Sequence, residues 1–425
     1  MLYFGRGSKT DVITPGETRA ILKQVFDAMG PKKRVMAIPP DFTRANSYAG
    51  PITEMVYDYF GEKLTDVMPA LGTHSPMTPE QIKAMFGHMP ADIVRVHDWR
   101  NDVVSVGTVP SSYIKEVSEG RLDYSMEAQV NKLLLDPGFD LILSIGQVVP
   151  HEVVGMANYT KNIFVGVGGS DFINKSHFIG ASFGMERMMG RAKTPVRDVF
   201  EYAREHFIPQ LPIVYVLTVR AKDSDGQMVT RGLFIGDDFE CFQKAAELSL
   251  QVNFIMVDRQ IRKCVVYLDP EEFKSTWLGN KAIYRTRMAL ADGAELIILA
   301  PALREFGEDK TIDGLIRKYG YRGTAHTLEC TAANKDLREN LGASAHLIHG
   351  SSEGRFGITY CPGPEMSREE IEGVGFKYCA YAEMASRYPV DKLRDGWNTM
   401  PDGEEIYYIS NPALGLWAHP DRFKD

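Results

Sequence analysis

The sequence lacks the features of secreted, membrane-spanning and nucleic-acid-binding proteins. It has no run of about 18 uncharged apolar residues. Arg6 and Lys9 near its start are not followed by an apolar segment, so we expect neither a signal peptide nor a membrane anchor. Acidic residues outnumber basic ones by 56 to 48, and the net charge of −8 argues against nucleic acid or an anionic membrane as the main partner. We therefore expect a cytoplasmic protein.

Cysteine is scarce and shows no ligand spacing. The five cysteines are an odd number, they are widely spread and they form no CxxC pair: Cys241, Cys264, Cys330, Cys361 and Cys379. This pattern favours reduced, buried thiols over a disulfide framework or a zinc site. The sequence also has no internal repeat and no low-complexity segment, which excludes a solenoid or a flexible tail.

The 425 residues, 44% hydrophobic and 24% charged, are typical of a globular protein with two or three domains. In the first part of the chain, strand-length apolar runs alternate with helix-like segments, as in α/β proteins. The strand-like runs are 34–40, 66–72, 91–98 and 139–149, and the helix-like segments are 52–64 and 78–87. In the last of these, Thr78 is expected to be the N-cap, Gln81 to complete a capping box and Gly87 to end the helix.

The later part of the chain predicts a second α/β domain. Residues 211–237 indicate a hairpin around Asp225-Gly226, followed by a helix over 239–252. A new alternation begins near Lys263, with a helix expected over 280–293 and a strand over 295–301. We therefore predict an α/β fold of two domains, 1–260 and 261–404, with the active-site cleft between them. The tail, 405–425, is expected to pack back on the first domain.

Three polar clusters follow predicted strands, at Asp41-Phe42-Thr43-Arg44, Gly72-Thr73-His74 and Pro150-His151. Because the carboxyl ends of parallel strands share one rim of a sheet, these side chains are expected to converge on one cleft. A single histidine after a strand is more often a capping or solvent-facing residue. The combination of two histidines with an arginine is what indicates a catalytic or binding site.

The segment after His151 holds further candidates. Lys161 and His177 flank the glycine-rich stretch 166–170, whose bare backbone can approach a phosphate or a ring closely. Neither H-x3-H nor HExxH occurs in this region, so spacing alone predicts no metal here. His346 and His349 form another pair, but without a third ligand nearby they are more typical of structural histidines. The residues by themselves indicate a two-domain α/β enzyme of undefined chemistry.

Taken together, these motifs resemble the nickel-dependent lactate racemase family, whose members invert 2-hydroxy acids with a nickel-pincer nucleotide. The family's D-x-T-R motif is found at Asp41 to Arg44, and its G-x-H motif at Gly72 to His74. Its P-H…G…K pattern is found at Pro150-His151, Gly155 and Lys161, and the histidine beyond that lysine is His177. The four pieces occur in the family's order and spacing, and the resemblance covers most of the chain.

The resemblance implies a racemase or epimerase, an isomerase that moves the α-hydrogen as hydride to and from the cofactor through a 2-keto acid. His74 and His151 would then be alternate acid and base, Lys161 the covalent attachment point of the cofactor (pyridinium-3,5-bisthiocarboxylic acid mononucleotide nickel), and His177 the nickel ligand. Asp41, Arg44 and the glycines Gly166, Gly168 and Gly169 would lie near the cofactor or substrate. Proteins that synthesise the cofactor would be required partners.

Departures from the family pattern leave the substrate open. Lactate-specific members carry Y-Q-x-x-K in the second domain, whereas this chain has Tyr284-Arg285-Thr286-Arg287-Met288. Arg285 or Arg287 would then bind the substrate carboxylate, which leaves room for a larger or dicarboxylic 2-hydroxy acid. Asn158-Tyr159-Thr160 replaces the usual small residues before Lys161, and a bulky Tyr159 there is expected to reshape the pocket.

Two other classes of function compete with this interpretation. One is a non-catalytic nucleotide- or ligand-binding homologue of the same fold, which would not need both histidines. The other is a nicotinamide dehydrogenase, but no GxGxxG follows a strand with an acidic residue about 20 positions later. The sequence does not define the substrate, the direction of flux or the oligomeric state.

Overall fold

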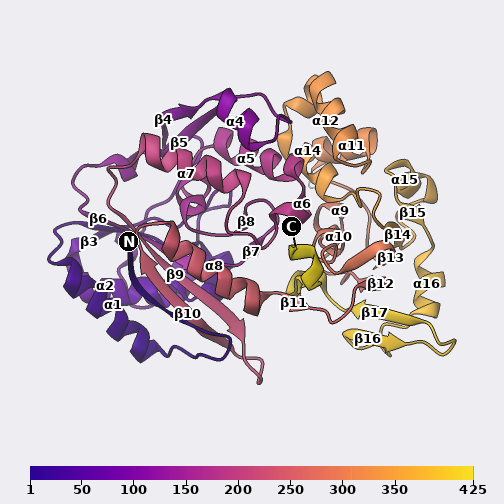
Figure 1. Ribbon diagram of the computed structural model, residues 1–425, viewed down its shortest axis with the longest axis horizontal. Helices are drawn as coiled ribbons and strands as arrows, with labels where there is room; N and C mark the ends of the chain where they lie inside the picture. The colour runs from indigo at the N-terminus through magenta and orange to yellow at the C-terminus, as the bar shows by residue number, and fades with distance from the viewer. Residues whose placement is uncertain (308, 425) are drawn as a thin grey trace. The chain divides into compact units, whose positions relative to one another are not determined.

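The computed structural model describes residues 1–307 and 309–424, which form two compact units (Figure 1). Unit 1 comprises residues 1–183 and 188–253, and unit 2 comprises residues 184–187 together with the chain from Phe254 onward. Each unit is built on a six-stranded sheet, which confirms the predicted class of two α/β domains. The change of unit at 253/254 lies slightly before the boundary expected near residue 260.

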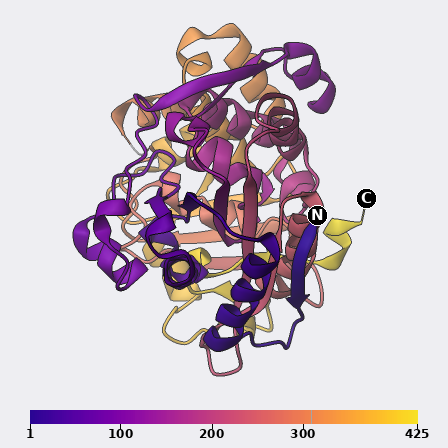
Figure 2. The same ribbon diagram turned by 90° about the vertical axis from the view of Figure 1, so that its left-hand side faces the viewer.

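The sheet of unit 1 is parallel in its centre and antiparallel at one side. Its strands run in the order β1 (Leu2–Gly7), β10 (Met228–Gly236), β9 (Ile213–Lys222), β6 (Leu141–Gln147), β2 (Val35–Ile38) and β3 (Leu64–Val67). Strands β3, β2, β6 and β9 are parallel, whereas β10 is antiparallel to both β9 and β1. Strands β9 and β10 are the hairpin predicted around Asp225-Gly226, and β1 is the edge strand beside β10 (Figures 1 and 2).

The helices of unit 1 follow from amphipathic patterns and caps in the sequence. They are α1 (Pro15–Met29), α2 (Ala49–Phe60), α3 (Pro79–Phe86), α4 (Ser111–Val117), α5 (Ser170–Phe183), α7 (Pro195–Phe207) and α8 (Phe239–Asn253). Helix α3 has the predicted Thr78–Gln81 capping box and ends at Gly87. Two short pairs, β4 (Val103–Val109) with β5 (Met126–Asn131) and β7 (Pro150–His151) with β8 (Gly155–Met156), complete the unit.

One predicted strand of unit 1 is wrong. Residues 91–98 form a 3-10 turn, Ala91–Ile93, and a single bridge between Val94 and Val67. Val96 is 54% exposed, so the apolar residues of this run do not share a buried face. Without that face, the segment has no packing that would hold it as a strand.

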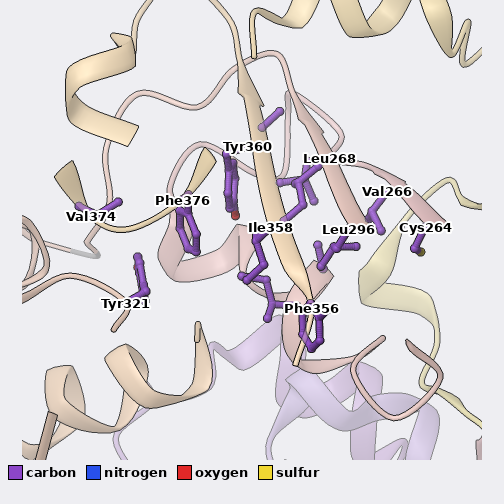
Figure 3. Packing of buried hydrophobic residues seen from close by; sticks show 14 of the residues in the cluster. Cys264, Val266, Leu268, Leu296, Tyr321, Phe356, Ile358, Tyr360, Val374 and Phe376 are labelled. Carbon is purple, nitrogen blue, oxygen red and sulfur yellow. The ribbon is translucent and has the colours of Figure 1, made fainter. Parts of the chain in front are cut away.

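The sheet of unit 2 is parallel except at one edge and is covered on both faces. The strand order is β15 (Lys377–Tyr378), β14 (Gly357–Pro362), β13 (Leu290–Ala300), β12 (Ile261–Tyr267), β17 (Glu405–Ile409) and β16 (Gly396–Thr399). Cys264 and Val266 of β12 pack with Leu296 and Ile358 on one face (Figure 3), whereas Val265 packs on the other. Burial of both faces explains why these strands are continuous apolar runs.

Short helices surround this sheet. They are α9 (Thr276–Gly279), α10 (Lys281–Tyr284), α11 (Lys310–Tyr319), α12 (Thr324–Ala333), α13 (Lys335–Arg338), α14 (Leu341–His349), α15 (Arg368–Gly373) and α16 (Tyr381–Arg387), with α6 (Met185–Met188) between the units in sequence. The helix predicted over 280–293 is wrong beyond α10, because β13 already begins at Leu290. The run 288–290 is buried throughout, and such a run does not distinguish helix from strand.

The end of the chain pairs within unit 2. Strand β17 lies beside β12, and β18 (Trp417–Ala418) pairs with β11 (Ile255–Met256). Residues 405–424 therefore belong to unit 2, whereas the sequence led us to expect them on the first domain.

All five cysteines have free thiols, and four of them are buried. Among the described residues, no helix has the length and apolar character needed to cross a membrane.

Candidate active site

A pocket of about 280 Å³ in unit 1 gathers the polar clusters that follow its parallel strands. Strand β2 leads into Asp41 and Arg44, the chain after β3 leads into His74, and the chain after β6 leads into His151. The predicted site residues that line the pocket are Asp41, Arg44, His74, His151, Lys161, Gly166 and His177. Their convergence is the geometry expected at the carboxyl ends of neighbouring parallel strands.

Asp41 and His74 form a hydrogen-bonded pair at the rim. Asp41 Oδ2 lies 2.5 Å from His74 Nδ1, and Asp41 Oδ1 accepts hydrogen bonds from Thr43 N–H (3.1 Å) and Thr43 Oγ1 (2.5 Å). Burial favours the protonated acid, but the bonds from His74 and Thr43 outweigh it and hold the pKa of Asp41 below its usual value. Because an ionised carboxylate only accepts, His74 Nδ1 carries the hydrogen and Nε2 keeps its lone pair. The side chain of His74 is 52% exposed, so this nitrogen can meet a ligand.

His151 is held in the opposite tautomer. Its Nδ1 accepts a 3.0 Å hydrogen bond from the backbone N–H of Val153. Burial lowers the pKa of His151 to about 3, and the nearby Lys161 and His177 contribute in the same direction. At neutral pH the ring is therefore uncharged, with its hydrogen on Nε2.

Lys161 lies where an unusual stretch of backbone begins. It precedes a π-helical turn, Asn162–Gly166, and π-turns are frequent at functional sites. The two residues Asn158 and Tyr159 have φ values of 68° and 60°, in the left-handed region that is strained for a bulky side chain. Burial, with help from Arg44, lowers the pKa of Lys161 to about 8. A substantial share of its amine is therefore neutral, and nucleophilic, at mildly alkaline pH.

His177 presents one nitrogen to the pocket. On α5, its Nδ1 donates a 2.6 Å hydrogen bond to the carbonyl oxygen of Ile173. This bond places the hydrogen on Nδ1 and leaves the Nε2 lone pair for a ligand, an orientation usual for metal-binding histidines. Burial lowers the pKa of His177 to about 4, with Lys161 adding to the effect, so the ring is neutral at pH 7 as metal binding requires.

Residues 156–161 form the segment that we call the Lys161 loop. The side chains that hold this loop in place could not be identified from the sequence. Arg197 on α7 has no exposed surface, and it donates hydrogen bonds to Met156 O (2.8 Å), Asn158 O (3.2 Å) and Thr160 Oγ1 (2.7 Å). Glu201, one turn further along α7, accepts a 2.8 Å bond from Thr160. An arginine in an amphipathic helix resembles any surface arginine until the tertiary structure buries it. Asn162 was also missed, because its role depends on tertiary contacts. Its side chain donates hydrogen bonds to Ile38 O and Ser144 Oγ, at 3.0 Å each.

Tyr159 does not reshape the pocket. Its ring is buried in the core of unit 1, stacks on Phe242 at 5.0 Å and lies 4.3 Å from the ring of Tyr215. The left-handed backbone at Asn158 and Tyr159 accompanies this inward placement. Asn158, not Tyr159, lines the pocket.

The three predicted cofactor glycines differ in their surroundings. Only Gly166 lines the pocket, where a Cβ atom would lie 2.6 Å from Cβ of Ala70. A Cβ on Gly168 would lie 1.9 Å from the carbonyl oxygen of Phe164, and one on Gly169 would lie 2.0 Å from Gln129 Oε1. In the structure these two glycines permit close packing of the chain, which is sufficient reason for their presence.

The predicted substrate residues of unit 2 already have partners. Arg287 is 2% exposed, and it donates to Glu186 Oε1 at 2.9 Å and to Ser351 O at 3.2 Å. Arg285 donates to the carbonyl oxygens of Ala413 and Gly415. Tyr284, at the end of α10, likewise has interaction partners. Carboxylate binding by either arginine would require it to leave these acceptors.

The donor set of the pocket suits a group that brings most of its own metal ligands. Within the described parts of the chain, no three His, Cys, Asp or Glu side chains gather to hold a metal ion. The pocket instead offers single imidazole nitrogens, on His177 and on the exposed His74, and one amine, on Lys161. These are the groups expected for a nucleotide that is attached through the lysine and holds its nickel largely with its own atoms.

Comparison with known proteins finds a domain match over the part of the chain that holds the pocket. Residues 20–188 match the model of the lactate racemase N-terminal domain, and this match contains every predicted site residue of unit 1. No curated protein sequence matches the chain.

Two solved structures show the same fold over nearly the whole chain. A crystal structure of a protein from Thermotoga maritima is 22% identical, with a TM-score of 0.74, and the alignment covers 96% of this chain and 98% of that one. The lactate racemase apoprotein from Thermoanaerobacterium thermosaccharolyticum is 15% identical, with a TM-score of 0.66, covering 97% and 94%. Residues 20–188 are therefore similar to the lactate racemase N-terminal domain, and the chain as a whole shares the fold of these two structures.

Proposed function

We propose that this protein is a racemase or epimerase of a 2-hydroxy acid that works with a nickel-pincer nucleotide held by Lys161 and His177. The observation that carries the proposal is the single pocket in which His74, His151, Lys161 and His177 meet. A protein that only binds a nucleotide would not need the two histidines in addition to the lysine and the metal ligand.

The resemblance gives the cofactor its part in the proposal. When bound, the nickel-pincer nucleotide would supply a hydride acceptor for the α-hydrogen of the substrate. The chain contributes the neutral amine of Lys161 for attachment and the free Nε2 of His177 for nickel. An imidazole nitrogen such as His177 Nε2 would suit nickel(II) as a ligand.

The two histidines handle the hydroxyl proton. His74, with its lone pair on Nε2 and its Nδ1–H bonded to Asp41, is ready to accept that proton as the α-hydrogen leaves. His151 lines the same pocket and carries its hydrogen on Nε2, which would donate a hydrogen bond to the oxygen of the keto acid. For inversion, the substrate oxygen must regain a proton on the new face. Protonated His74 would return it after the keto acid rotates, or protonated His151 would supply it, and the two histidines would then exchange protons with water to restore their starting states.

The roles of the histidines are not equivalent in the unliganded pocket. Protonation of His151 would break the bond from Val153 and place a cation near Lys161 and Arg44. A substrate carboxylate beside these groups would neutralise them and raise the pKa of His151. Arg44 on the same rim offers a bidentate donor for that carboxylate.

The test is production of the protein in a host that makes the cofactor, followed by intact-mass and nickel analysis and a chiral assay of 2-hydroxy acids. We expect an adduct on the peptide that contains Lys161, near-stoichiometric nickel and racemisation of at least one substrate. Lys175→Ala on α5 is the matched control for Lys161→Ala, because it removes a lysine outside the pocket. Absence of adduct and nickel, while a known family member is loaded in the same host, would favour the binding-protein alternative.

A further inference from the structure

Two cationic side chains of the candidate active site, Lys161 and Arg44, have no direct partner in the described part of the chain. Both line the pocket of about 280 Å³. Neither the amine of Lys161 nor the guanidinium of Arg44 makes a hydrogen bond or an ion pair with any residue that the structure describes. Charged groups that leave bulk water are usually paired. The two groups therefore indicate a site that is open to an incoming molecule.

The carboxylates closest in effect to these cations are engaged elsewhere. Asp41 attracts Arg44, but its two oxygens accept hydrogen bonds from His74 and Thr43. Glu152 favours the ammonium form of Lys161, but it does not line the pocket. Among the described residues, no carboxylate bonds directly to either cation, so both remain available to an anion from solution.

The surroundings of Lys161 favour a nucleophile over a fixed charge. Arg44 and Arg197 both disfavour the ammonium form of Lys161, and burial acts in the same direction. Lysines that are desolvated or lie near another cation attack carbonyl groups and form Schiff bases. Arg44 adds to this pocket a planar donor that suits a carboxylate. In so small a pocket, a molecule that uses both groups must carry its carbonyl close to its carboxylate, as a 2-keto acid does.

We propose that, before a cofactor is attached, Lys161 forms an imine with a small 2-keto acid whose carboxylate is bound by Arg44. The amine nitrogen adds to C2 of the keto acid, and the new N–C bond forms as the π bond of the carbonyl group opens. His74, whose Nε2 holds a lone pair, transfers the two amine hydrogens in turn to the oxygen, which leaves as water. The step needs no oxidant or reductant, and addition of water reverses it.

This reaction would occupy the residue to which the proposed function assigns the cofactor. The imine uses the same nitrogen as the attachment, so a 2-keto acid and the cofactor would compete for Lys161. Because the imine is hydrolysed by water, the keto acid would delay loading without preventing it. The inference does not rest on the proposed function, since imine formation is measurable on the cofactor-free protein.

The test is reductive trapping with pyruvate as the probe. Cofactor-free, full-length protein is incubated with pyruvate and then with sodium borohydride, which reduces an imine to a stable secondary amine. Intact mass is expected to show one carboxyethyl group per chain at saturating pyruvate, and peptide mapping is expected to place this group on Lys161. Lys175, which lies outside the pocket and pairs with Asp171, is the internal control and should stay unlabelled.

Variants separate the roles of the two cations. Lys161→Ala should lose the label, whereas Lys175→Ala should keep it. Arg44→Gln should raise the pyruvate concentration for half-maximal labelling by about tenfold, because a hydrogen-bonded charge contact is lost. Propanal has a carbonyl group but no carboxylate, so its half-maximal concentration should change far less in Arg44→Gln. Arg19→Gln, at an exposed arginine outside the pocket, is the matched control for Arg44→Gln.

The contrary outcomes are distinct. A label spread over surface lysines, or no label on Lys161 above the level on Lys175, would overturn the inference. Equal effects of Arg44→Gln on pyruvate and propanal would show that Arg44 does not bind the carboxylate, which would remove the 2-keto acid as the reactant. If the chain takes up no nickel adduct in a cofactor-producing host but pyruvate still labels Lys161, the proposed function fails and this inference stands.

Discussion

Two pairs of histidines, one in each unit, are similar in burial but differ in what their nitrogens contact. Burial lowers the pKa of His151 to about 3 and of His177 to about 4 in unit 1, and lowers the pKa of His346 to about 3 in unit 2. His346 Nε2 lies 3.0 Å from Tyr321 Oη and 3.4 Å from Asn280 Nδ2, and its ring stacks on Trp277 at 4.4 Å. His177 uses only Nδ1, on a backbone carbonyl, and keeps Nε2 toward a pocket.

The comparison shows that burial and a lowered pKa do not identify a chemical site by themselves. His151, His177 and His346 are all neutral at pH 7, and both a buried core and a metal ion require neutral imidazole. The distinguishing property is the second nitrogen, which in His346 completes a buried network and in His177 remains open to a ligand.

The largest effect expected from this difference is on the nickel content of the loaded protein. His177→Ala removes the only imidazole lone pair that we assign to the metal, so nickel should fall from near one equivalent to almost none and racemisation should be lost. His346→Ala removes a buried histidine of unit 2 and should leave nickel per folded molecule unchanged. Metal analysis of both variants, after loading in the same host, makes the comparison. Equal nickel in the two variants would remove His177 from the site.

A smaller effect is expected from the acid–base residue. His151→Ala should lower kcat for the accepted 2-hydroxy acid by about 10²- to 10⁴-fold, the range usual for a lost general acid or base. Nickel and the Lys161 adduct should remain, because His151 is neither ligand nor attachment point. Chiral analysis of product against time, normalised to loaded cofactor, measures this. A loss of adduct in parallel with activity would instead give His151 a structural role in the loop.

Sequence reasoning located the polar clusters because their positions depend on local rules. The Thr78–Gln81 capping box and the Asp225-Gly226 turn each follow from a few neighbouring residues, and the structure has them where expected. The strand expected over 66–72 is shorter, because β3 already ends at Val67. Parallel strands then bring the clusters together, since their carboxyl ends share an edge.

Features that depend on tertiary packing were out of reach. Arg197 supports the Lys161 loop only because α7 is placed beneath residues 156–160, and nothing in its neighbouring sequence encodes this. Tyr159 was expected in the pocket from its position in sequence, but an inward-facing aromatic cluster holds its ring. The resemblance to a family supplied the roles of Lys161 and His177, which spacing alone did not indicate.

The arginines of unit 2 provide a test of moderate size. Arg287 is buried and paired with Glu186, so Arg287→Ala should lower the free energy of unfolding of unit 2 by about 2 kcal/mol. Loss of a buried ion-pair partner can cost more than this, but Arg355 still pairs with Glu186 in the variant. Arg304→Ala, at a half-exposed arginine beside Glu305, is the control. Urea unfolding measures the change. A raised KM with unchanged stability would instead support substrate binding by Arg287.

The last prediction concerns the pH dependence of stability and separates a core histidine from a surface one. The pKa of His346 is about 3 in the folded chain and about 6.5 in the unfolded chain, so as the pH falls below about 6.5 the unfolded state takes up a proton first. The stability of unit 2 should therefore be complete above about pH 6.5 and should decrease toward pH 3, by at most about 1.4 kcal/mol per pH unit from this residue. Urea titrations followed by tryptophan fluorescence suit the measurement, because Trp277 packs on His346.

His346→Gln should reduce the slope of the free energy of unfolding against pH between pH 6.5 and 5. His206→Gln, on the exposed surface of α7, is the matched control. An unchanged slope in His346→Gln would show that other groups control the acid sensitivity of unit 2.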